Sequence, residues 1–438
     1  MPLRDIVYII IFASVQIPAL TRPWVALLVW AWVDYMQLHR FCHDFVMWAV
    51  PVTVISSVTT FLSMVVSSER MRYPLTRETV LYLLFMGWMG VTTIFALNPV
   101  DASEQFSGVV KIQILIVCTL IVMREAWRVQ MLVWTIVVSL GFYGIKGGLF
   151  TILSGGSHRV HGPRWSFIAD NNDIALAMIT TLPLIRYLML NTQNRLVRSG
   201  LGISILLTGV SVLGTHSRGG LLGLVVVILC MLLKSRKKVL FGIVLIAGSF
   251  FALSSDLMPK SWFDRMHSIQ DYEQDQSAMG RINSWRFAVN LAADRPVLGG
   301  GFKTFNRAMF KRYAPNPDDY HEAHSIFFKI LAEHGYVGLL MFLLLAFFTY
   351  RSASWVMKAT RDQPELLWAH DLMSMTQVAI IGYGAGGALL NLAYYDLPYH
   401  LMAIVVLTKL RVREQLYASA SQGKPAAREL SQRELLPA

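Results

Sequence analysis

Long apolar runs recur along almost the whole chain and constrain its fold more than any other feature. They lie at positions 5–20, 23–38, 45–66, 79–97, 106–123, 129–153, 172–190, 199–214, 218–233, 239–254, 325–350, 371–394 and 397–411. A helix of about 20 apolar residues crosses a bilayer, where lipid offers no partner to exposed backbone polar groups. The runs are continuous rather than alternating, which excludes a membrane β-barrel. The sequence therefore predicts an all-α, polytopic membrane bundle of about 12 transmembrane helices.

The composition agrees with this prediction. Hydrophobic residues make up 55% of the 438 residues and charged residues only 15%. The net charge of +12 is typical of cytoplasmic loops in a membrane protein and does not indicate nucleic-acid binding. Cys42, Cys118 and Cys230 are scattered, so they predict neither a disulfide framework nor a metal set. Neither a cofactor nor a metal is expected.

Basic clusters predict which loops face the cytoplasm. They occur at 124–128, 186–198, 234–238 and 351–361, and the tail after Lys409 is also basic. Positions 154–171 and 255–323 then lie on the opposite side, where acids and bases balance. Thirteen spans would place the N-terminus on that outer side. If 5–20 and 23–38 form one irregular element, about twelve spans remain and both termini are cytoplasmic.

Four regions follow from this layout. Transmembrane helices occupy 1–254, a large outer loop with short helices 255–323, further transmembrane helices 324–411, and a cytoplasmic, disordered tail 412–438. Within the large loop, positions 281–292 predict an amphipathic helix, because Trp285, Ala288, Val289 and Ala292 share one face. Pro296 ends this helix.

A histidine stands where the large loop meets the next apolar run, in His321-Glu-Ala-His324. We expect His324 in the first turn of a membrane helix, at the boundary with water, where an imidazole can transfer protons near neutral pH. The alternative is an interfacial residue that only caps the helix. Zinc-binding helices need histidines at i and i+4, and position 325 is Ser, so a metal site is not predicted.

Two arginines are candidates for binding an anionic group. Arg218 lies between two apolar runs, beside Gly219 and Gly220. A charge at membrane depth is costly, so it usually faces a cavity or a partner, and a guanidinium binds phosphate through two bonds. Arg281 begins the amphipathic helix, one turn before Trp285. The alternatives are a snorkelling arginine and an ordinary loop arginine.

Supporting roles are predicted for a few further residues on the outer side. The 154–171 loop combines Arg159, His161 and Arg164 with Trp165, a mixture that suits an anionic head group or a sugar, or an ordinary interfacial loop. Asp396 precedes the last apolar run and is expected either to orient a catalytic residue or to cap a helix.

Several of these motifs, in this order, resemble the O-antigen ligase superfamily. They are Ser217-Arg-Gly-Gly-Leu-Leu-Gly223, Arg281-x-x-x-Trp285, Pro296-Val-Leu-Gly-Gly-Gly-Phe302 and the stretch Ala323–Leu339. Ser325 stands where the superfamily usually has Asn. That change, the Asp170-Asn-Asn-Asp173 run, Arg22-Pro-Trp and Leu38-His-Arg40 are most similar to the branch called exosortase-A-associated O-glycosylation ligase.

The resemblance implies a metal-independent glycosyltransferase of the bacterial inner membrane. Such an enzyme moves a glycan from undecaprenyl diphosphate to a periplasmic acceptor, usually lipid A–core. His324 matches the essential histidine of the superfamily, and Arg218 and Arg281 match arginines that handle the diphosphate. Asp396 is a weaker match, and His321 is a further supporting candidate.

Two alternatives, one with the same donor and one of another class, are compatible with the sequence. A polysaccharide polymerase or a protein O-oligosaccharyltransferase would use the same donor with a glycan or a protein hydroxyl as acceptor. A lipid-glycan transporter would need no chemistry, and it predicts arginines distributed through several spans. The notable cations here cluster on the outer side instead, which favours an enzyme.

Overall fold

The structure is a computed structural model that describes residues 2–43, 46, 50–234 and 276–421. Every regular element in these ranges is helical. The elements are α1 (Leu3–Ala19), α2 (Pro23–Met36), η1 (Leu38–Phe41), α3 (Val52–Val66), α4 (Arg77–Ile94), α5 (Pro99–Val122), α6 (Ala126–Leu153), α7 (Asn171–Asn191), α8 (Arg195–Gly214), α9 (Arg218–Leu233), α12 (Gln276–Asp294), α13 (Arg307–Tyr313), α14 (Ile326–Ala359), η3 (Pro364–Leu366), α15 (Leu367–Gly387) and α16 (Asp396–Ser421).

Five of these helices, α5, α6, α7, α8 and α14, are long and apolar enough to cross a membrane, and α3 and α9 are shorter apolar helices. The all-helical architecture and these spans fit the predicted polytopic helical membrane protein. The number of about twelve spans remains a prediction. The expected span at 239–254 lies outside the described residues, as does the start of the large loop.

Local signals set the helix ends. The side chains of Asp170, Asn194 and Ser217 each accept a backbone N–H from the first turn of α7, α8 and α9. Pro23 is the first residue of α2, a position where its missing N–H costs nothing. The first two apolar runs therefore form two separate helices rather than one irregular element.

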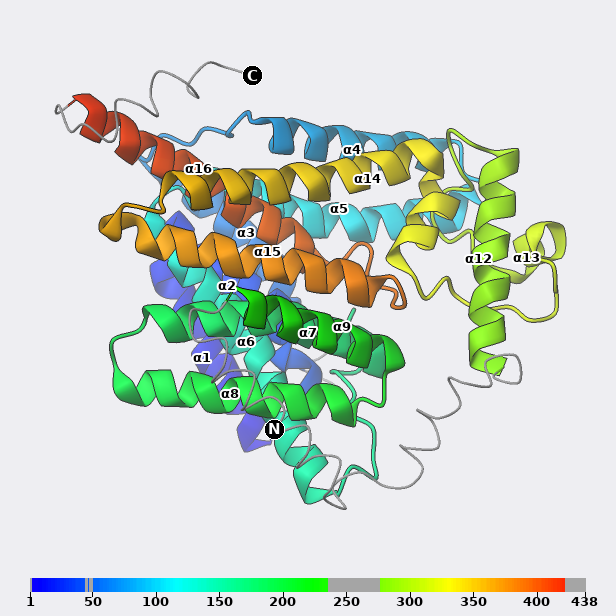
Figure 1. Cartoon of the computed structure of the whole chain (residues 1–438), viewed down its shortest axis with the longest axis horizontal. Coiled ribbons are helices and arrows are strands. Elements are labelled where there is room, and N and C mark those ends of the chain that lie inside the picture. The colour runs from blue at the N-terminus through cyan, green and yellow to red at the C-terminus, as the bar shows by residue number, and fades with distance from the viewer. Residues whose placement is uncertain (1, 44–45, 47–49, 235–275, 422–438) are drawn as a thin grey trace.

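Figure 1 shows the long helices side by side, with α12 and α13 crossing one end of the bundle. We call this end the α12 end. Three contacts place loops from distant parts of the chain there. The N–H of Leu97 donates to the O of Gly300, the Nη2 of Arg295 donates to the O of Phe95, and the side chain of Asn171 donates to the O of Thr215.

Three elements differ in length from their predictions. The amphipathic helix is longer, at Gln276–Asp294. α14 continues to Ala359, beyond the expected end at 350, because its last two turns still bury Ala353 and Val356. α16 continues to Ser421, so the first ten residues of the expected disordered tail are helical. The buried Val412 and Leu416 hold this extension against the core.

Candidate functional site

His324 lies directly before α14 rather than in its first turn, with Ser325 as the N-cap residue. Its backbone is left-handed, with φ of 43°. For a residue other than glycine this conformation costs on the order of 1 kcal/mol and tends to occur at functional sites. The side chain is half-buried. The strain therefore supports a functional role independently of any motif.

The helix α12 holds the segment that carries His324. The Nε1 of Trp285 donates to the O of Ala323 at 2.9 Å, and its ring stacks on Phe328 at 5.1 Å between centroids. The Oγ of Ser284 donates to the O of His321 at 3.2 Å. The predicted amphipathic face of α12 therefore packs against the loop and α14 and fixes His324 in place.

Arg281 lies one turn before Trp285 on the same helix, so both side chains share the face that meets this loop. Burial lowers the pKa of His324 below its ordinary value of 6.5, and the positive charge of Arg281 lowers it further. Glu322 and Asp170 act in the opposite direction. The two predicted residues thus interact, and His324 is neutral at pH 7, as a general base must be.

Arg218 is the first residue of α9 and lies at the same end of the bundle. Its two following glycines allow close packing: a β-carbon on Gly219 would come within 3.0 Å of the side chain of Leu390, and one on Gly220 within 2.9 Å of Ala175. The turn after α15 that contains Leu390 also runs beside the start of α14, since a β-carbon on Gly387 would collide with Ile326. The residue that follows Arg218 and the first residue of α14 therefore both pack against this stretch of the chain.

A group of charged and amide side chains beside His324 was missed by the sequence analysis. Glu322 accepts from the Nζ of Lys329 at 3.4 Å and from the Nδ2 of Asn391 at 3.3 Å. Asp173 at the start of α7 interacts with Lys329 and with the backbone N–H of Asn391. The signal that could have found it is Lys329, a charge inside an otherwise apolar span.

α14 is broken at Gly335, where φ is 68°. The loop after α12 fills the break: the N–H of Tyr336 donates to the O of Pro296 at 2.8 Å, and the N–H of Gly300 donates to the O of Ala332 at 2.7 Å. Irregular backbone inside a membrane helix requires such internal partners. The hydrogen bonds at the break therefore hold the loop after α12 against α14, the helix that follows His324.

A buried polar network supports the break. The hydroxyl of Tyr394 donates to the Oε2 of Glu333 at 2.5 Å and bonds the Nε2 of His334 at 2.8 Å. The Nδ1 of His334 bonds the hydroxyl of Thr92 at 2.7 Å. These contacts join α4, α14 and the segment before α16. Their partners satisfy both imidazole nitrogens, so His334 has a structural role here.

The other predicted residues lie in different surroundings. The Nε2 of His321 bonds the Oδ1 of Asp319 at 2.8 Å, and the side chain of His321 is partly exposed. Arg159 and Arg164 are exposed on the 154–170 loop. Asp396 is buried and interacts with Asp34 of α2, away from His324. Over the described ranges there is no group of three or more His, Cys, Asp and Glu side chains that could hold a metal ion.

Two comparisons with known proteins bear on this site. The sequence model of the O-Antigen ligase family matches residues 203–343, and a family of unknown function matches residues 3–193. The first match contains Arg218, Arg281 and His324.

A curated protein of Rickettsia prowazekii (strain Madrid E), provisionally named a polysaccharide ligase, is 25% identical to this chain over 279 residues. The alignment covers 60% of this chain and 66% of the relative, just under two thirds of its length. The match over residues 203–343, together with this relative, supports the resemblance to the O-antigen ligase superfamily.

Proposed function

We propose that this protein is a glycosyltransferase of the bacterial inner membrane that moves a glycan from undecaprenyl diphosphate to a periplasmic acceptor. The observation that carries the proposal is the interaction of a neutral, strained His324 with Arg281 at the α12 end. This combination offers a base beside a guanidinium that can bind phosphate. Similarity to the O-Antigen ligase family over residues 203–343 supports a reaction of the glycan ligase or polymerase type.

In the proposed reaction, the neutral imidazole of His324 takes the proton of the acceptor hydroxyl. The hydroxyl oxygen then attacks the anomeric carbon of the glycan while the bond to the diphosphate breaks on the opposite side. This geometry inverts the anomeric carbon. Arg218 and Arg281 bind the departing diphosphate and stabilise its growing negative charge. The proton on His324 passes afterwards to water.

Lipid A–core is the acceptor that we propose, with the lipid portion of both substrates held at the membrane surface. The α12 end then faces the periplasm, where such acceptors are located. The proposed chemistry uses only protein side chains, so transfer is expected to continue in the presence of a chelator such as EDTA.

The test is a transfer assay with purified protein and a radiolabelled glycan on undecaprenyl diphosphate. Lipid A–core, a second lipid-linked glycan and an unfolded acceptor protein are supplied in separate reactions. We expect labelled lipid A–core. Label on the second glycan or on the protein would assign the enzyme to the polymerase or protein-glycosylation type. Movement of the donor across a liposome membrane with no covalent product in any reaction would instead indicate a transporter.

A further inference from the structure

A groove runs between α2, α3 and α5, in the part of the chain before residue 193 that matches a family of unknown function. Its cavity measures about 390 Å³, and the loop at Trp165–Phe167 closes one end. Small-molecule sites typically enclose about 300–1,000 Å³. None of His324, Arg218 and Arg281 lines this groove. It is therefore separate from the proposed transfer site.

One part of the groove is apolar and open to the side of the bundle. Trp30, Val54 and Phe61 line it, and Val54 and Phe61 are 58% and 44% exposed. Phe61 follows Thr53 by eight residues on α3, so this part extends roughly 12 Å along the helix. This apolar lining, formed by side chains of α2 and α3, suits a hydrocarbon chain.

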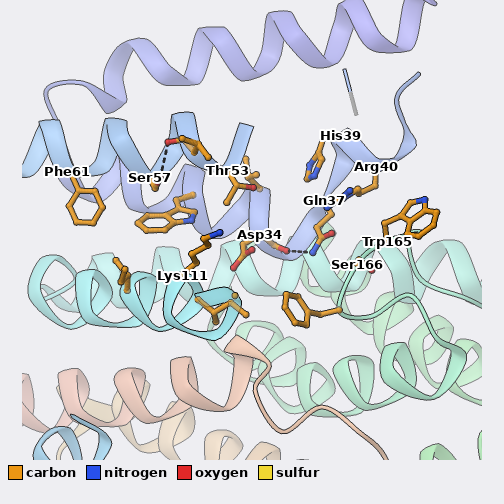
Figure 2. Close-up of a pocket in the computed structure, with 17 residues that line it drawn as sticks. Asp34, Gln37, His39, Arg40, Thr53, Ser57, Phe61, Lys111, Trp165 and Ser166 are labelled. Atoms are coloured by element: carbon orange, nitrogen blue, oxygen red, sulfur yellow. Dashed lines mark hydrogen bonds between the residues drawn. The ribbon is translucent and has the colours of Figure 1, made fainter. Parts of the chain in front are cut away.

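The other part of the groove is polar and faces the α12 end. Figure 2 shows Arg40, His39 and Gln37 of the segment after α2 near Trp165, and Lys111 reaching in from α5 beside Asp34. Lys111 is residue 13 of the 24 in α5, a candidate membrane span. A cation in such a helix is costly unless it faces a cavity or a partner, and Lys111 faces this groove.

The charges along the lining favour an anionic ligand. Among the described lining residues, Arg40 and Lys111 are the cations and Asp34 is the acid, and the carboxyl of Asp34 interacts with that of Asp396. Burial, followed by the charge of Arg40, lowers the pKa of His39 to about 4, so this side chain is neutral at pH 7. Its Nδ1 is buried and makes no hydrogen bond to the described part of the chain, which leaves it available to a ligand.

Two residues of the polar part have strained backbones. Gln37 and Trp165 have φ of 44° and 62°, although neither is a glycine. Strain of this kind persists where the surrounding structure maintains it, often at ligand sites. Gln37 and Trp165 both line the polar part of the groove. This observation agrees with a site built to hold a molecule.

We propose that the groove binds an anionic glycerophospholipid of the surrounding membrane. The phosphate lies between Arg40 and Lys111, within reach of His39, and one acyl chain lies along Trp30, Val54 and Phe61. Trp165 covers the head group at the membrane surface, where tryptophan is favoured. The inference does not depend on the proposed transfer reaction.

The test is native mass spectrometry of the full-length protein, stripped of lipid in detergent and titrated with phosphatidylglycerol. We expect saturable binding, weak binding of diacylglycerol, which lacks the phosphate, and no displacement by millimolar inorganic phosphate. Arg40→Gln and Lys111→Gln should each lower the affinity for phosphatidylglycerol about tenfold or more, since each removes a charge-assisted contact. Phe61→Ser should lower it without changing the charge.

The matched control is Arg195→Gln, which removes an exposed charge at the far end of the bundle and should leave binding unchanged. Thermal unfolding of every variant checks that it is folded. Wild-type affinity in the folded Arg40 and Lys111 variants would overturn the proposal. So would displacement of the lipid by inorganic phosphate. Binding of undecaprenyl phosphate but not of phosphatidylglycerol would assign the groove to the donor chain and overturn it as well.

Discussion

If His324 is the base, the transfer activity should depend on pH in a way that can be measured. Its neutral form is the proposed base, so activity should fall as the pH drops through its pKa, which lies below 6.5 because of burial and Arg281. Removing the cation with Arg281→Gln makes protonation easier and should shift the acid limb of the kcat/KM profile to higher pH. Glu322→Gln removes an anion that favours protonation and should shift it to lower pH.

The opposite directions of these two shifts separate an effect on His324 from a general loss of activity. The profiles are recorded with purified protein and saturating acceptor. Identical acid limbs in wild type and both variants would mean that His324 does not control this part of the profile.

The arginines should require their guanidinium geometry and not only their charge. Arg218→Lys and Arg281→Lys keep the charge but lose the two-bond contact with phosphate, so turnover should fall roughly tenfold to hundredfold. Arg286→Lys is the control, because Arg286 is exposed on the same helix as Arg281. Kinetics with a soluble donor analogue measure the effect. Wild-type turnover in the two test variants would mean that these arginines do not bind the diphosphate and only anchor the protein at the membrane surface.

Arg218, Arg281 and His324 could be singled out from the sequence because each lies in a short local motif, and their roles stay predictions. The strained backbone of His324 could not be predicted, since it depends on how α12 clamps Ala323. The group of Glu322, Asn391 and Asp173 was missed for a similar reason. Its members come from three distant segments that meet only when α7, α14 and the turn after α15 pack together.

At the scale of elements, the break in α14 makes a prediction about stability. Gly335 adopts φ of 68°, and a β-carbon there would collide with the backbone oxygens of Pro296 and Val297. Gly335→Ala should therefore destabilise the protein by about 1–3 kcal/mol and lower the Tm in detergent. Gly209→Ala on α8 is the control, because a β-carbon there meets nothing within 4 Å. An equal Tm for the two variants would contradict the structural role of the break.

Periodicity predicted the existence of α12, and Pro296 predicted where it ends, although the helix begins earlier than the predicted range. The break at Gly335 was not predicted, because Gly335 lies inside the expected span at 325–350 and glycine is common in membrane helices. The sequence also left open whether positions 5–20 and 23–38 form two helices or one irregular element, and the structure has two helices, α1 and α2. Both are short, and it is their packing around Tyr8, Val29 and Val33 that fixes them.

For the whole molecule, the loops gathered at the α12 end should face the periplasm. The test uses a chain in which Cys42, Cys118 and Cys230 are replaced by alanine. A membrane-impermeant maleimide should label Ser157→Cys, at the α12 end, in cells with a permeabilised outer membrane. It should label Arg195→Cys, at the opposite end, only after the inner membrane is broken. The reverse pattern would invert the orientation.

The proposed transfer reaction depends on His324 acting as the base. The most direct measurement is the turnover of purified His324→Ala with a lipid diphosphate donor, next to His158→Ala, an exposed histidine of the 154–170 loop. General base catalysis contributes about 10²–10⁴-fold, so His324→Ala should lose at least a hundredfold in turnover while it still binds donor, and His158→Ala should match wild type. Near-normal turnover in folded His324→Ala would contradict the account.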